Sequence, residues 1–134
     1  MEIVYQDTHR FQPADLQELF LSVEWSSGHY PDRLVQAMEN YETVYTAWDG
    51  RKLVGLICAM DDGIMTAYVH YLLVHPKYQH LGIGRQLVEQ IKDTYRDYLR
   101  LVLVAYHDEM GFYESCGFQK AEDASPMFIT TLWT

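Results

Sequence analysis

Two glycines, Gly82 and Gly84, follow a strongly apolar stretch and open a segment in which apolar residues recur at helical spacing. The first backbone N–H groups of a helix have no partner within the helix, and together with the helix dipole they form a binding site for anions. Glycine has no Cβ, so a diphosphate can approach this backbone closely. The turn therefore predicts a site for a phosphate-bearing ligand.

Two common phosphate-binding motifs do not fit this turn. The dinucleotide-binding fingerprint needs a third glycine where Leu87 stands, and no acidic residue closes a following strand near position 103. A P-loop needs Gly-Lys-Ser/Thr, whereas Gly84 is followed by Arg85 and Gln86. The pattern that does fit is Gln/Arg-x-x-Gly-x-Gly/Ala, which spans residues 79–84.

The elements that must position this turn follow from apolar periodicity and turn residues. Asp-Gly pairs at 49–50 and 62–63 predict tight hairpins. A continuous apolar run at 101–105 predicts a strand buried on both faces. The expected order is β-α-α-β-β-β-α-β-α-β in a single domain over residues 1–134, with helices beginning at Pro13 and Pro31, further helices at 83–95 and 109–115, and strands at 1–7, 43–48, 52–60, 64–74, 101–105 and 126–133.

Composition and charge argue against several classes of protein. The chain is 49% apolar and 22% charged, which is typical of a soluble globular domain, and it has no apolar run near the ~20 residues of a membrane span. Its net charge of −9 does not suit a nucleic-acid binder, which needs a basic surface. The histidines, Cys58 and Cys116 lack metal-ligand spacing, so no metal is expected. No signal-peptide pattern is present, and a cytoplasmic location is expected.

The glycine turn at 79–84 and a second motif, Phe-Tyr-x-x-x-Gly-Phe at 112–118, together resemble the GNAT superfamily of acetyl-CoA-dependent N-acetyltransferases. The resemblance covers nearly the whole chain. It implies an α/β (α+β) fold with a central mixed, mostly antiparallel sheet, splayed fourth and fifth strands, and about four flanking helices. It also implies an enzyme that transfers the acetyl group of acetyl-CoA to an amine by direct attack, since no nucleophilic triad can be assembled.

The resemblance also implies which residues bind CoA. In the family, the diphosphate of CoA lies on the glycine turn, and pantetheine fills the gap between the splayed strands. Leu73 and Val74 are then expected to bond the pantetheine amides through their backbone groups. Tyr106 stands where many relatives have asparagine, so no contact is inferred there. The expected diphosphate contacts come from the turn: Gln79, His80, Leu81, Gly82, Ile83, Gly84 and Arg85.

Two side chains are the predicted catalytic groups. Tyr113 matches the family tyrosine near the CoA sulfur, and a phenol of reference pKa about 10 remains protonated at neutral pH and can protonate the leaving thiolate. Tyr68 and His70 share one face of the strand at 64–74, where the arylalkylamine N-acetyltransferase branch carries two histidines that relay the amine proton. His70 keeps the histidine and is the expected base or water relay. Tyr68 departs from that pattern and is expected to contact the substrate.

The loop after the first helix lines the acceptor pocket in this superfamily. Here it holds Glu24, Trp25 and Tyr30, a flat apolar surface beside a carboxylate, which suggests a small aromatic or aliphatic amine. A last hairpin near residues 124–127 is expected to form the opposite rim. Acetylation of a protein lysine or N-terminus, and a non-catalytic acyl-CoA sensor module, remain alternatives. The identity of the amine, a longer acyl donor and a homodimer also stay open.

Overall fold

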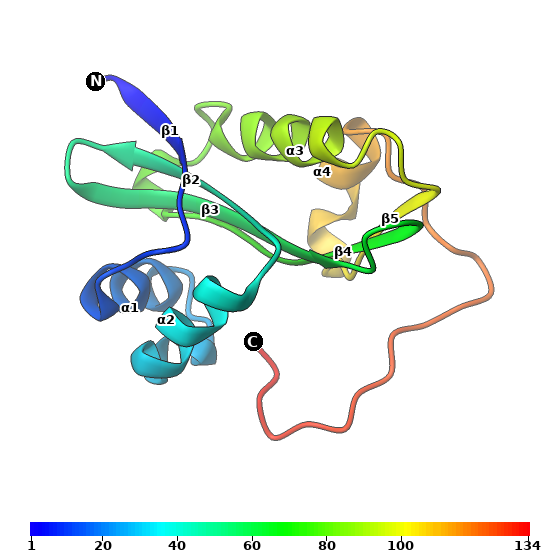
Figure 1. Cartoon of the computed structure of the whole chain (residues 1–134), viewed down its shortest axis with the longest axis horizontal. Coiled ribbons are helices and arrows are strands. Elements are labelled where there is room, and N and C mark those ends of the chain that lie inside the picture. The colour runs from blue at the N-terminus through cyan, green and yellow to red at the C-terminus, as the bar shows by residue number, and fades with distance from the viewer.

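The computed structural model describes residues 1–134 and contains one five-stranded sheet with helices on both faces (Figure 1). Neighbouring strands pair antiparallel, except for the last two, which pair parallel. The expected α/β architecture with a mixed, mostly antiparallel sheet is confirmed. The strands lie in sequence order across the sheet: β1 (Ile3–Asp7), β2 (Thr43–Asp49), β3 (Lys52–Asp61), β4 (Thr66–Val74) and β5 (Arg100–Leu103).

Four α-helices flank the sheet, as expected, and two of them begin at a proline. Proline suits the first position of a helix because its fixed φ is helical and it has no N–H to leave unpaired. No helix is both long and apolar enough to cross a bilayer. The helices are α1 (Pro13–Ser22), α2 (Pro31–Asn40), α3 (Ile83–Thr94) and α4 (Met110–Ser115), with short 3-10 turns η1 (Ser26–His29), η2 (Pro76–Tyr78) and η3 (His107–Glu109).

Two apolar layers hold the helices against the sheet. On one face, α3 buries Ile83, Leu87 and Ile91 against β2, β3 and β4. On the other face, α1 and α2 bury a second cluster that includes Phe20 and Met38. Figure 1 shows these layers above and below the sheet, so that β3 and β4 lie at the centre of the molecule.

The expected divergence of β4 and β5 is confirmed. The two strands pair only from Thr66 and Arg100 to Val69 and Leu103, although β4 continues to Val74. A β-bulge begins the divergence: on β3, Ala59 pairs with Val69 and Cys58 with Tyr71, which leaves His70 as the extra residue. Bulges bend the strand that carries them. The edge of β4 from His70 to Val74 therefore faces an open gap.

The prediction of a last strand at Pro126–Trp133 is wrong. This segment has no strand assignment and no backbone pairing, and there is no hairpin at 124–127. Its aromatic and β-branched residues resemble a strand, but a strand also needs a partner edge. Instead, the segment runs around the open side of the molecule and returns toward α1 and α2 (Figure 1). There, the Ser27 N–H donates to the Thr134 carbonyl oxygen at 2.8 Å.

Two further strand predictions need correction. The run at 101–105 forms only the short strand β5, and it is not buried on both faces, since Val102 is 38% and Val104 46% exposed. The reason is that neither valine belongs to the apolar cluster that α1 and α2 bury against the sheet. In addition, β4 begins at Thr66 rather than at position 64, because the Asp62 carboxylate accepts the N–H groups of the intervening residues and holds them in the turn.

Candidate active site

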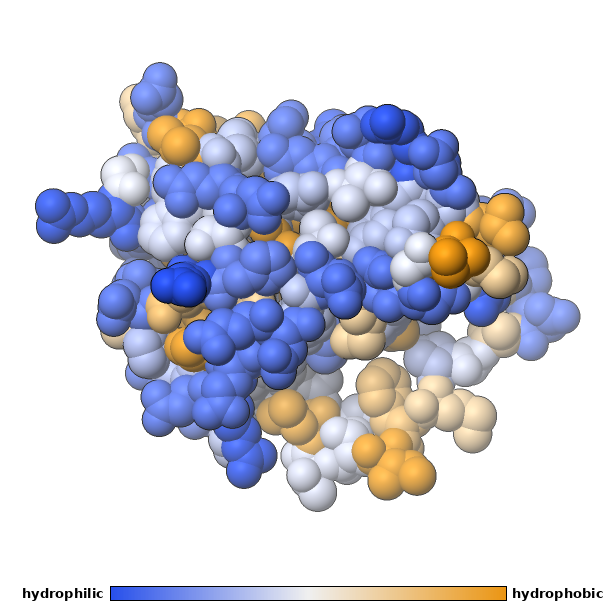
Figure 2. All heavy atoms as spheres, viewed as in Figure 1, coloured by the Kyte–Doolittle hydropathy of each residue, from blue (hydrophilic) through white to orange (hydrophobic).

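A cavity of about 1310 Å³ opens where β4 and β5 diverge. It is bounded by β4, the end of β5, the start of α3, α4 and the C-terminal segment. On the face shown in Figure 2, apolar residues gather toward the C-terminal segment, whereas most of the remaining surface is hydrophilic. Of the residues predicted to act in CoA binding and catalysis, the cavity lining contains His70, Leu73, Val74, Gln79, His80, Gly82, Ile83, Gly84, Arg85 and Tyr113, but not Leu81.

The glycine turn and the first residues of α3, together the glycine corner (residues 79–85), leave a run of backbone N–H groups without partners. Gly82 caps α3 with φ +84° and His80 has φ +65°, so the chain turns sharply just before the helix. The first N–H to bond back is that of Gln86, which donates to the Gly82 carbonyl at 3.0 Å. The six N–H groups of residues 80–85 donate to no other protein atom. Six free donors at a helix N-terminus form an anion-binding site.

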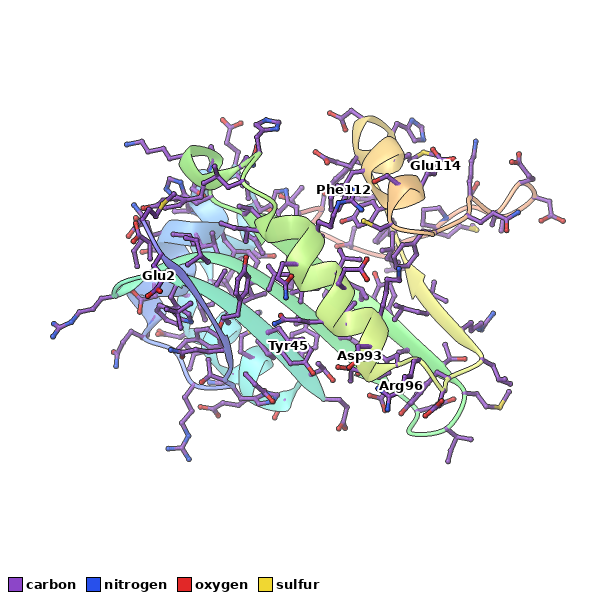
Figure 3. All side chains as sticks on the ribbon, turned by 90° about the horizontal axis from the view of Figure 1, so that it is seen from above. Glu2, Tyr45, Asp93, Arg96, Phe112 and Glu114 are labelled. Carbon is purple, nitrogen blue, oxygen red and sulfur yellow. The ribbon has the colours of Figure 1, made fainter.

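Two side chains fix this corner to its neighbours. Gln79 Nε2 donates to the Val74 carbonyl at 3.0 Å, which ties the corner to the end of β4. Arg85 Nη2 donates to Ser115 Oγ at 2.7 Å, and its guanidinium lies 5.8 Å from the centre of the Phe112 ring. Figure 3 shows Phe112 on α4, between that helix and the start of α3. The two sequence motifs are therefore in direct contact.

The bulge places His70 among aromatic rings. Its ring stacks on Tyr71, with centroids 4.1 Å apart, and on Tyr68, with centroids 5.7 Å apart. Tyr68 and His70 thus share a face, as predicted. Burial lowers the pKa of His70 below its ordinary value. The ring is therefore mostly neutral at neutral pH, the state that a proton acceptor requires.

Tyr113 lies on α4 and faces the cavity. Its ring packs edge to face against Phe112 and Phe118, with centroids 5.2 and 5.9 Å away. Burial raises the pKa of Tyr113 to about 12, and the negative charge of Glu109 adds to the effect. The hydroxyl therefore keeps its proton at neutral pH and is able to donate it.

Aromatic residues surround the end of the cavity nearest α1. Trp25 lies 5.9 Å from Tyr71 and 6.4 Å from Tyr106, measured between ring centroids. The Tyr71 hydroxyl shares a hydrogen bond of 2.8 Å with Ser27 Oγ, which also donates to the Thr134 carbonyl at 2.7 Å. The C-terminal segment is thereby joined to the loop after α1.

Of the four predicted substrate contacts, the cavity lining includes Trp25 and Tyr68 but not Glu24 or Tyr30. Glu24 adopts φ +60°, which turns the chain so that Trp25 points inward while Glu24 stays exposed. The ring of Tyr30 lies under the Arg33 guanidinium, 5.6 Å away. Sequence reasoning missed Tyr71, because in a regular strand it would face away from His70 and only the bulge brings the two rings together.

A diverging strand pair, an anion-binding helix start and a buried tyrosine are the features that an acyltransferase using a CoA thioester would need. Residues 40–120 match the family model described as an acetyltransferase (GNAT) domain. The chain therefore belongs to the GNAT acetyltransferases, a family that generally uses acetyl-CoA.

Individual relatives agree with this assignment. An uncharacterized N-acetyltransferase of Porphyra purpurea is 32% identical over 131 residues, which cover 91% of this chain and 73% of the relative. A chloroplastic GCN5-related N-acetyltransferase of Arabidopsis thaliana is 38% identical over 69 residues, which cover 50% of this chain but only 29% of that relative. The solved structure of a GNAT family acetyltransferase from Streptococcus pneumoniae TIGR4 superposes with a TM-score of 0.83 at 28% identity, over 97% of this chain and 98% of that one.

Proposed function

We propose that this protein transfers the acetyl group of acetyl-CoA to the primary amine of a small molecule. The observation that carries the proposal is the run of six free N–H groups at residues 80–85, placed beside the gap between β4 and β5. Diphosphate binding needs such donors, and an extended chain of amides needs the unpaired edge of a strand.

The residues present fit both the diphosphate and the pantetheine of CoA. The glycine corner would hold the diphosphate through its backbone N–H groups, with Arg85 nearby as a positive charge. The unpaired edge of β4 from His70 to Val74 would bond the pantetheine amides as a neighbouring strand does. This direction would carry the thioester from the corner along β4 toward His70, and Tyr113 lines the same cavity.

Two side chains supply the proton transfers of the reaction. An amine is mostly an ammonium ion at neutral pH and must lose a proton before its nitrogen can attack the thioester carbonyl. His70 accepts that proton, directly or through a water molecule, because its lowered pKa keeps the ring neutral. The departing thiolate takes a proton from the Tyr113 hydroxyl. The nitrogen of the tetrahedral intermediate still carries one proton too many, and its loss returns a proton to the Tyr113 phenolate, while the His70 imidazolium releases its proton to solvent. The products are then the acetylated amide, free CoA and one proton in solution.

The shape of the acceptor end favours a small amine that carries an apolar group. The rings of Trp25, Tyr71 and Tyr106 offer flat apolar surfaces, and an ammonium ion is attracted to such faces. The segment at 126–134 passes over this side of the cavity and is bonded to η1 through Thr134. That route leaves less room for a protein substrate. The net charge of −9 also favours a cationic substrate over an anionic one.

The test is release of free CoA thiol from acetyl-CoA, measured against a panel of small arylalkyl and aliphatic amines and against lysine-containing and N-terminal peptides. Release with small amines alone is expected. The H70Q and Y113F variants should lower kcat while calorimetry shows unchanged CoA affinity. Release with peptides alone would establish protein acetylation instead. CoA binding without turnover of any acceptor would indicate a sensor module.

A further inference from the structure

Tyr41 provides the one hydrogen bond that the His70 ring makes with the protein. The Tyr41 Oη lies 2.5 Å from Nδ1 of His70, and the two rings meet edge to face with centroids 5.9 Å apart. Tyr41 directly follows α2, and its N–H donates to the Ala37 carbonyl at 3.0 Å, which fixes its backbone. Tyr41 does not line the cavity, whereas His70 does. The tyrosine therefore approaches the imidazole from the protein side.

We propose that Tyr41 is a positioning residue for this reaction: its hydroxyl holds Nδ1 of His70 in the protonated form, so that Nε2 faces the cavity as the proton acceptor. The inference rests on the proposed function, in which His70 takes the proton of the amine. It adds Tyr41, which lies outside the cavity, to the residues on which proton transfer to His70 depends.

The reason lies in how a neutral imidazole holds its single proton. With the proton on Nδ1, that N–H donates to the Tyr41 oxygen and Nε2 keeps a free lone pair. With the proton on Nε2, that nitrogen has no free lone pair and cannot accept the proton of the amine. Once Nε2 has taken the proton of the amine, both nitrogens carry hydrogen, and the Nδ1–H bond to Tyr41 persists. The proton transfer therefore breaks no hydrogen bond at Nδ1.

The other groups around His70 are neutral. Tyr68 and Tyr71 on β4 stack against its ring, and the buried Cys58 thiol on β3 lies near Tyr41. Burial raises the pKa of all three groups, and of Tyr41 itself, so none of them is charged at neutral pH. Burial alone explains why the pKa of His70 is lowered, and no charged group adds to the shift. In the proposed tautomer, the Tyr41 oxygen is the acceptor that stabilises the imidazolium at Nδ1.

The first test reads the tautomer directly by ¹⁵N NMR of the histidine rings, with H70Q used to assign the His70 signals. Above its pKa, His70 of the wild type should carry its proton on Nδ1. In Y41F this preference should be lost, and the pKa of His70 should fall by about one unit, because the imidazolium loses a hydrogen bond to its charged form. A wild-type ring protonated on Nε2, or a tautomer and pKa unchanged in Y41F, overturns the proposal.

A matched control is Y45F. The Tyr45 hydroxyl also makes one side-chain hydrogen bond, at 2.5 Å to Thr94 Oγ1. Figure 3 shows Tyr45 near Asp93, toward the end of α3 that lies away from Phe112. This variant loses one tyrosine hydroxyl outside the site, so both the NMR signals of His70 and the kinetics should remain those of the wild type.

The second test is the pH profile of kcat/KM with an amine that the wild type acetylates. In Y41F the acid limb should move to lower pH by about one unit and the plateau should fall about tenfold, while the KM for acetyl-CoA stays constant. An unchanged limb and plateau, or a change in the acetyl-CoA KM alone, would contradict a positioning role. If no amine is acetylated at all, the proposed function fails, and the NMR measurement still decides whether Tyr41 sets the tautomer.

Discussion

Replacing Gly82 with alanine separates the backbone geometry of the glycine corner from every side-chain effect. Gly82 has φ +84°, and a Cβ built there meets no atom within 4 Å, so the G82A variant changes only the backbone preference. A left-handed conformation costs an L-residue about 1–2 kcal/mol. Gly63, in the turn before β4, has φ +81° and is equally open, and G63A is the matched control. Both variants should lose the same ~1–2 kcal/mol of stability, or several degrees in Tm.

Only G82A should also weaken CoA binding. If the strain relaxes by turning one N–H away from the diphosphate, a hydrogen bond to a charged group worth about 1.5–3 kcal/mol is lost. The Kd for CoA should then rise roughly 10- to 150-fold. Titration calorimetry with CoA, and with pantetheine as a ligand that lacks the diphosphate, checks this. G63A should bind CoA like the wild type, and all three proteins should bind pantetheine alike. G82A binding CoA as tightly as the wild type despite its lower Tm would refute the reasoning.

Three further outcomes are expected. Y113F should lower kcat about 100-fold with little change in CoA affinity, because the leaving thiolate loses its proton donor; an unchanged kcat would leave Tyr113 a packing residue. Burial raises the pKa of the Cys58 thiol to about 12, so Ellman's reagent at pH 8 should not modify it in the folded protein, and rapid labelling there would contradict this. Because the folded state lowers the pKa of His70, the unfolded state binds the proton more readily and stability should fall as the pH drops below about 6.5; urea denaturation at pH 7 and pH 5 should show a smaller loss in H70Q than in the wild type.

Local chemistry explains what could be predicted about this fold. The hairpins at Gly50 and Gly63 follow from Asp-Gly pairs, and both glycines adopt positive φ. The sequence likewise predicted the helix starts at Pro13 and Pro31 and the apolar face of α3. Each of these features depends on residues within one or two helical turns. The last strand was mistaken for the opposite reason: Pro126–Trp133 has the composition of a strand, but pairing depends on an edge elsewhere in the molecule.

The candidate site divides in the same way. Sequence motifs pointed to the glycine corner, since free N–H groups at a helix start and a left-handed Gly82 are properties of a few adjacent residues. They also pointed to His70 and Tyr113 as individual residues, and the structure places both on the cavity. Spacing alone could not show that Glu24 stays outside the cavity lining, because this depends on the left-handed turn of the backbone at that residue.

The partners of these residues were decided by tertiary structure. The bulge that stacks Tyr71 on His70 belongs to the pairing of β4 with β3, and it lies just past the point where the pairing of β4 with β5 ends. Tyr41 reaches His70 from 29 positions earlier in the chain, and Thr134 reaches Ser27 from 107 positions later. Contacts between residues so far apart in the chain depend on how the helices pack on the sheet. A local sequence pattern therefore does not predict them. The amino-acid sequence thus determined most of the helices and strands and the anion-binding turn, whereas packing determined the last segment of the chain and the surroundings that set the protonation of His70.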